Sequence, residues 1–343
     1  MPELRSKEFS SNIPDVTFDA SDKAHVVVEI DNEPVYDEWL VPVMNGSGGT
    51  IALQDLSGMV TPYARKRQTV TLTINATAED GSSLFSAITE VVYCQADLGD
   101  ETAEHFLENH FLSILMGRKM TAVGRLEYLH MQGSETANCT AYYSDGTTKQ
   151  FSVNVVHSTS HYRTLDVSPG NFIAAGKVLT NYTVTAGSRS QDFDIDLANP
   201  DCAPILIFIN SFGLDELAYC TGIHKVDPAF KRSMAYVGRI QRNYKIDETR
   251  SFKADTGPLT IDMANWWDEV FRSDSVRVVN FCEGNPNIGR DLLITESKSE
   301  HSNDDAEIPR FTFTYQYAQR NHNVVDLLRA GRIFDNTFDN TFN

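Results

Sequence analysis

The segment DMANWWDEVFRS (residues 262–273) and the runs VRVVNF (276–281), DLLITES (291–297) and RFTFTYQY (310–317) decide the fold of the last part of this chain. In the first segment the apolar residues recur three and four positions apart, which is typical of a helix with one buried face. These residues are Met263, Trp266, Trp267, Val270 and Phe271. The three runs are short and rich in β-branched and aromatic residues, which is typical of strands. With the extended residues 243–260 before them, they predict strand, helix, strand, strand, strand.

Two residues mark the start of this helix. Pro258 fixes the backbone where a turn enters it, and Asp262 is placed to cap its free amides. The run 310–317 alternates aromatic residues with Thr and Gln, as a strand with one buried face does. We therefore expect a C-terminal β-layer with one flanking helix.

This part of the chain resembles the largely uncharacterised tail-region structural proteins of phages and prophages of gut Bacteroidetes. The resembling positions are INSFGLDE (209–216), ADTGPLT (254–260), the tandem Trp266 and Trp267, LLITES (292–297) and FTFTYQYA (311–318). The resemblance implies a non-enzymatic tail or baseplate component, made in the host cytoplasm and assembled with copies of itself and with other tail proteins. It carries no catalytic residue to this chain.

Composition narrows the possible partners. The 343 residues carry a net charge of −18, which repels nucleic acid and anionic membranes. The basic triplet Arg65, Lys66 and Arg67 is interpreted as a solvated turn before a strand. No apolar run is long enough to span a bilayer, and the first residues lack the apolar core of a signal peptide. We expect no nucleic-acid binding and no membrane insertion.

The remaining segments predict a mainly β protein of sandwich-like domains with two prominent helices. Residues 1–120 read as a β-domain closed by the helix DETAEHFLENHFLSILMGRK (100–119), with Asp100 as its N-cap. Residues 121–200 alternate apolar and polar positions and predict a middle β-domain. Residues 201–322 form the predicted β-plus-helix domain, and residues 323–343 a docking helix or arm.

Two aromatic pairs are candidates for glycan binding. Trp266 and Trp267 could stack on a sugar of the host surface, although packing in the core is the favoured interpretation. Because adjacent helical side chains diverge, one of them is expected at a domain or subunit contact. Tyr142 and Tyr143 are further stacking candidates for the alternative function, a carbohydrate-binding adhesin or receptor-binding module.

Motifs for metals and catalysis are weak. Asp192, Asp194 and Asp196 alternate along a predicted strand, so a solvated face is favoured and a weak metal site is left open. His157 and His161 lie in a polar, β-branched segment that separates their rings. The five cysteines are scattered, and no nucleophile motif is present. The sequence predicts no catalytic residue and no cofactor.

The last residues make the most specific prediction. Phe334, Phe338 and Phe342 recur every fourth position among Asp and Asn, which favour neither helix nor strand. Three exposed phenylalanines would favour aggregation. We therefore expect this tail to dock into an apolar groove, on its own chain or, as an assembly contact, on a neighbouring subunit; the alternative is a frayed terminus.

Overall fold

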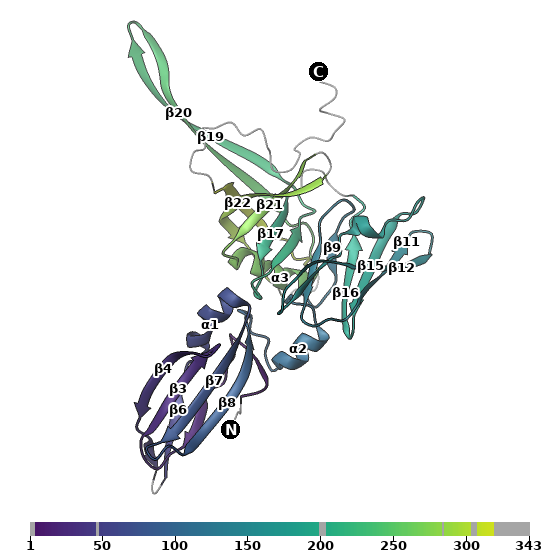
Figure 1. Cartoon of the computed structure of the whole chain (residues 1–343). Coiled ribbons are helices and arrows are strands. Elements are labelled where there is room, and N and C mark those ends of the chain that lie inside the picture. The colour runs from purple at the N-terminus through teal and green to yellow at the C-terminus, as the bar shows by residue number, and fades with distance from the viewer. Residues whose placement is uncertain (1–3, 46–47, 199–203, 283–284, 303–306, 319–343) are drawn as a thin grey trace.

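The structure, a computed structural model, describes residues 4–45, 48–198, 204–282, 285–302 and 307–318. Three β-domains follow one another along an elongated molecule, and a long hairpin projects from the third (Figure 1). The predicted class, mainly β with sandwich-like domains, is confirmed, although the described residues contain three α-helices instead of two prominent ones.

The first domain is a sandwich of two sheets. Its five-stranded sheet has the order β1-β8-β7-β3-β4, and its three-stranded sheet has the order β2-β6-β5. The bounds are β1 Lys7–Phe9, β2 Val16–Asp19, β3 Ala24–Ile30, β4 Glu33–Leu40, β5 Val43–Asn45, β6 Gly48–Leu53, β7 Thr69–Ala78 and β8 Ser83–Val92. In β3 every second residue is buried, because successive side chains point to opposite faces of a sheet.

Helix α1 (Leu56–Arg67) corrects the interpretation of the basic triplet. Arg65, Lys66 and Arg67 form its last turn, where cations interact favourably with the negative end of the helix dipole. Pro62 lies inside the helix, and the apolar stripe of the helix is weak. The spacing of apolar residues therefore did not indicate a helix here. Val60 and Ala64 nevertheless pack into the core of the first domain.

The helix predicted for residues 100–119 is much shorter, which is a second correction. Helix α2 covers only Ala103–Asn109, and its N-cap is Thr102 in place of Asp100. The chain is extended at His110, and residues beyond it enter three separate cores. Phe111 joins the core of the middle domain, Leu112 joins a core beside α2, and Leu115 joins the core of the third domain. One helical stripe points in a single direction and could not reach all three.

The middle domain is also built from two sheets, in the orders β12-β11-β15-β16-β9 and β10-β14-β13. The bounds are β9 Lys119–Thr121, β10 Tyr128–Met131, β11 Ala137–Tyr143, β12 Thr148–Ser152, β13 Asn154–Ser158, β14 Arg163–Asp166, β15 Leu179–Ala186 and β16 Arg189–Ile195, with a 3-10 turn, η1, at Pro169–Phe172. Because β9 pairs in parallel with β16, the predicted boundary at residues 120 and 121 falls inside a strand of this domain.

The third domain confirms the predicted order of strand, helix and three strands. Its sheet has the order β18-β17-β21-β22-β23-β20-β19. The bounds are β17 Ile205–Ile209, β18 Asp215–Tyr219, β19 Lys225–Val237, β20 Ile240–Asp255, α3 Ile261–Arg272, β21 Val276–Cys282, β22 Asn285–Lys298 and β23 Thr312–Tyr317. The N-cap of α3 is Thr260, whose Oγ1 accepts from the amide of Met263, so Asp262 lies in the first turn and is not the cap.

Candidate functional site

The third domain meets the middle domain at a cluster of polar side chains that the sequence analysis missed. We call it the buried hub, and its members are Ser113, Lys119, Glu127, Asn210, Glu216 and Trp266. Charged residues are almost never fully buried unless they are paired. The sequence contains a signal that could have indicated this cluster: Glu216 is an acid within the apolar run 205–220.

Glu216 accepts hydrogen bonds at both carboxylate oxygens. Its Oε1 accepts from Ser113 Oγ at 2.9 Å and from Trp266 Nε1 at 3.0 Å. Its Oε2 accepts from Asn210 Nδ2 at 2.9 Å. Asn210 in turn holds the adjacent tight turn, because its Oδ1 accepts from the amides of Phe212 and Leu214. The segment INSFGLDE is therefore built around this carboxylate.

Lys119 brings the middle domain into the hub. Its Nζ lies 2.5 Å from Glu127 Oε1, 3.5 Å from Glu216 Oε1 and 4.9 Å from the centre of the Trp266 ring. Burial lowers the pKa of Lys119, but the two carboxylates outweigh burial and raise it, so the ammonium stays charged. Burial raises the pKa of Glu127 to about 7, because one cation does not offset two buried acids. The hub therefore joins the middle and third domains through buried charged groups.

The tandem tryptophans are buried, which corrects their proposed role as a sugar platform. Trp266 and Trp267 are 1% and 0% exposed, so neither ring face can receive a ligand. As expected from their divergence, Trp266 faces the hub at the domain contact, while Trp267 packs against Phe271 and Phe313. The indole Nε1 of Trp267 is buried without a hydrogen-bond partner in the described structure.

Glu269 of α3 lies between the first and third domains. Its Oε1 accepts from the amide of Ser211, and its buried Oε2 has no hydrogen-bond partner among the described residues. Burial, and then the charge of Glu216, raise its pKa to about 7. The adjoining cavity of about 140 Å³ is lined from the first domain by Arg65 and Tyr93, among others. The third domain contributes Ser211, Ser273 and Asp274 to the same cavity.

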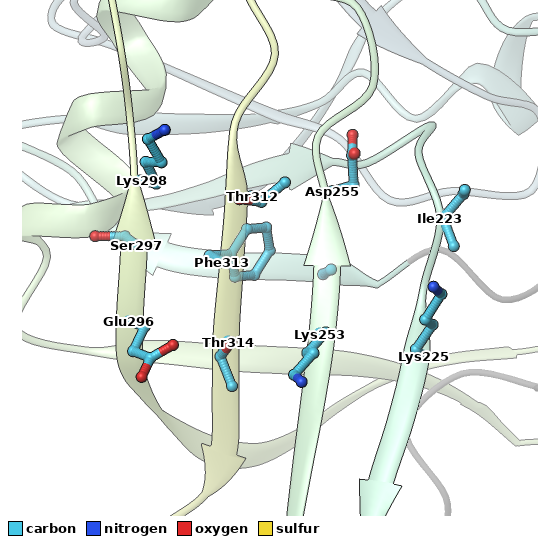
Figure 2. A pocket seen from close by; sticks show the side chains of 11 residues that line it. Ile223, Lys225, Lys253, Asp255, Glu296, Ser297, Lys298, Thr312, Phe313 and Thr314 are labelled. Atoms are coloured by element: carbon cyan, nitrogen blue, oxygen red, sulfur yellow. The ribbon is translucent and has the colours of Figure 1, made fainter.

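One hollow lies on the outer face of the third domain's sheet, at the base of the hairpin (Figure 2). Figure 2 shows Lys225, Lys253 and Lys298 around it, with Asp255 and Glu296 among them, and its volume is about 640 Å³. The Nζ atoms of Lys253 and Lys298 lie 3.0 and 3.1 Å from carboxylates outside the hollow. Phe313 also lines this hollow, but the residue is 3% exposed and its ring packs against Trp267 and Phe271. The residues that line the hollow therefore include no exposed aromatic ring for stacking on a sugar.

A second hollow, of about 390 Å³, lies on the middle domain. It is lined by Tyr142 together with Arg118, Asn181 and Asp192. Tyr142 is 37% exposed, whereas Tyr143 is buried and donates from its hydroxyl to the Phe172 carbonyl. Of the two predicted tyrosines, only Tyr142 is therefore open to a ligand.

The candidate metal ligands hold other contacts. Asp194 pairs with Arg118 at 2.9 Å, Asp192 accepts from Thr183 Oγ1, and Asp196 accepts from the Tyr219 hydroxyl. Within the described ranges, no three His, Cys, Asp or Glu residues are placed to hold a metal ion. No helix in the described parts of the chain is long and apolar enough to cross a membrane.

The β19–β20 hairpin projects from the third domain (Figure 1) and exposes apolar side chains to solvent. We define its outer part, residues 228–246, as the arm. It turns at Gly238, whose φ of +66° suits the first central position of a type II′ turn. It exposes seven large apolar side chains: Phe230, Met234, Tyr236, Val237, Ile240, Tyr244 and Ile246. The sequence analysis placed an extended segment only from residue 243, and the signal it missed was Gly238 between two β-rich runs.

The predicted assembly contacts Phe334, Phe338 and Phe342 lie outside the described residues, as does the rest of residues 319–343. Docking of this tail stays a prediction.

Comparison with known proteins identifies no family. No family model matches, and no curated protein matches. Among solved structures, the extracellular region of plexin A4 aligns at a TM-score of 0.19 and 9% identity, over 91% of this chain and 39% of that one. Titin Ig tandem domains A164-A165 align at a TM-score of 0.22 and 13% identity, over 55% of this chain and 91% of theirs. Alignments at this level carry no functional argument.

Proposed function

We propose that this chain is a non-enzymatic structural component of a phage tail or baseplate, located in the virion and assembled through contacts with copies of itself and with other tail proteins. The observation that carries the proposal is the arm. Its exposed apolar side chains form a patch of the kind that marks interaction surfaces. The resemblance of residues 209–318 to tail-region proteins is the reason for proposing a phage tail as the particle into which this chain assembles.

The domain junctions support the same role. The buried hub ties the middle domain to the third. The exposed ion pair between Arg65 and Asp274 and the bond from the Gln95 amide to the Ser211 carbonyl join the third domain to the first. A structural subunit that transmits load needs fixed domain angles, whereas interdomain contacts that are small and solvated leave domains free to move. A network of buried polar bonds has this fixing effect.

Mass spectrometry and immunogold labelling of purified particles test the proposal. We expect the chain in the particles, at a fixed ratio to other tail proteins and labelled on the tail. Its presence only in the free protein fraction of the lysate would overturn the proposal.

The hollow at Tyr142 favours a second candidate, binding of a host-surface glycan. An exposed aromatic ring beside Asn181, Asp192 and Arg118 offers a stacking face together with hydrogen-bond donors and acceptors. Glycan-array binding that is lost in Tyr142→Ala and kept in Tyr36→Ala, a tyrosine change on the first domain, would support it. An array without any signal for the full chain would remove it.

A further inference from the structure

We infer that the arm of one copy pairs with the outer edge of strand β4 in the first domain of a second copy, so that copies join head to tail. This inference rests on the proposed assembly function and deepens it, by naming the two surfaces and the partner.

The arm needs a partner for stability. Strand β20 pairs with β23 over Phe252–Asp255, and among the described strands β19 and β20 pair only with each other beyond this point. The free ribbon from Asp227 to Val237 is roughly 35 Å long at about 3.3 Å per residue. An isolated two-stranded hairpin is marginally stable in water, because neither face buries apolar surface. Docking against a partner would bury the exposed apolar side chains of the arm and so stabilise it.

The charge of the arm selects an acidic partner. It carries five cations and no acidic residue: Lys231, Arg232, Arg239, Arg242 and Lys245. Of these, Lys245 is paired at 2.8 Å with Asp247, which directly follows the arm. The net charge of −18, less these five positive charges, leaves −23 on the other residues. Nucleic acid or an anionic membrane would attract the arm but repel that remainder. A second copy of this chain is acidic itself, so the same asymmetry favours its approach.

Strand β4 provides the matching surface. It ends its sheet and pairs only with β3 among the described strands, so its other edge presents unpaired backbone groups. Glu33, Asp37 and Glu38 are exposed along it. Trp39 is an exposed apolar side chain on this strand and Val41 follows it closely, while Val43 and Met44 are exposed on β5 of the other sheet. Among the described edge strands, β4 combines exposed acids with the exposed Trp39; β13 exposes Val155 and Val156 but has no acid, and β12 carries Lys149.

The two surfaces fit in chemistry and in geometry. β19 is itself the last strand of its sheet, so two edge strands can complete each other's backbone hydrogen bonds. The arm and β4 lie at opposite ends of the molecule in Figure 1, so the contact joins different copies. A contact between two different surfaces is heterologous, and repetition produces a closed ring or an open helical fibre.

Charge reversal with the full chain tests the inference. Analytical ultracentrifugation is run on the wild type, on an arm variant (Arg239→Glu with Arg242→Glu) and on an edge variant (Asp37→Lys with Glu38→Lys). We expect the wild type to self-associate, less strongly at high salt. Each variant alone should dissociate roughly tenfold or more easily, because like charges then face each other. An equal mixture of the two variants should associate again, because every arm then finds an edge of opposite charge.

Two controls keep the result specific. A variant with Lys66→Glu and Lys149→Glu changes the net charge as much as the arm variant, at exposed sites away from both surfaces, and should associate as the wild type does. Thermal melting confirms that each variant is folded, since Asp37 also bonds to His25.

Three outcomes would overturn the inference: a wild type that stays monomeric at every concentration, an edge variant that associates normally, or a mixture that fails to recover. Binding of duplex DNA or anionic vesicles by the wild type, lost in the arm variant while self-association persists, would assign the arm to that partner instead. Presence in particles without charge-dependent association would defeat the inference alone. Association by these surfaces without presence in particles would defeat the tail function alone.

Discussion

Trp266 donates from its indole Nε1 to Glu216 Oε1 across 3.0 Å, so the tandem tryptophans and the INSFGLDE segment meet in the buried hub. The two motifs are fifty residues apart in sequence. The bond explains why an acid lies within an apolar strand. It also shows that Trp266 contributes a hydrogen-bond donor to the hub and offers no ring face to a ligand.

The first prediction compares the two tryptophans. Trp266→Phe removes the donor to Glu216, whereas Trp267→Phe removes an indole N–H that has no partner in the described structure. Both changes remove similar apolar area. We expect Trp266→Phe to cost about 1–3 kcal/mol more, because it leaves a buried carboxylate short of one bond. Denaturant unfolding at pH 7 measures the difference, and equal costs would contradict the role of this bond.

The second prediction concerns the cation of the hub. Lys119→Met leaves Glu127 and Glu216 buried without their ammonium, and should cost about 3–5 kcal/mol near pH 8. The neighbouring change Arg118→Met, at an exposed pair, should cost about 0–1 kcal/mol. At pH 5 the penalty for Lys119→Met should shrink, because Glu127, whose pKa burial raises to about 7, is then protonated and uncharged. Unfolding curves at both pH values test this, and a penalty independent of pH would argue against the buried charges.

The third prediction follows from the raised pKa of Glu269. A carboxyl with a pKa of about 7 when folded and about 4.5 when unfolded contributes its full stability below pH 4.5 and loses it as the pH rises through 7. Glu269→Gln removes this loss, so the variant should gain stability over the wild type between pH 5 and pH 8, by up to about 3 kcal/mol. Thermal midpoints across that range measure the gain. Parallel pH curves for the two proteins would be the contrary result.

The fourth prediction concerns two glycines with positive φ. A Cβ at Gly213 would lie 2.8 Å from Gln68 Nε2 and 3.1 Å from the Tyr93 ring, at the junction of the first and third domains. A Cβ at Gly238 would meet nothing within 4 Å. Both changes to Ala pay roughly 1–2 kcal/mol for the left-handed backbone, but Gly213→Ala adds about 1–3 kcal/mol of overpacking. We expect a lower melting midpoint for Gly213→Ala than for Gly238→Ala. The reverse order would show that the junction of the first and third domains accommodates the added methyl group at little cost.

The spacing of apolar residues in the sequence predicted correctly those helices and strands that turn one face towards a single core. The alternation of residues 310–317 and the stripe on residues 262–273 predicted β23 and α3, because the period of a buried face is written in neighbouring residues. Residues 110–118 broke this rule, since Phe111, Leu112 and Leu115 serve three different cores. Helix α1 was missed for a different reason: its buried residues face one core, but only Leu56, Val60 and Ala64 are buried.

The sequence by itself determined the β-rich class, the order of elements in the third domain and the acidic charge, because composition and short-range periodicity carry them. Tertiary structure alone decided that Lys119, Glu127 and Glu216 share one buried hub, because the pairing of distant strands brings them together. It also decided that Trp266 and Trp267 are buried while Tyr236 and Tyr244 are exposed. Residue type gives a preference for burial, but only the packing of domains determines which aromatic side chains find a core.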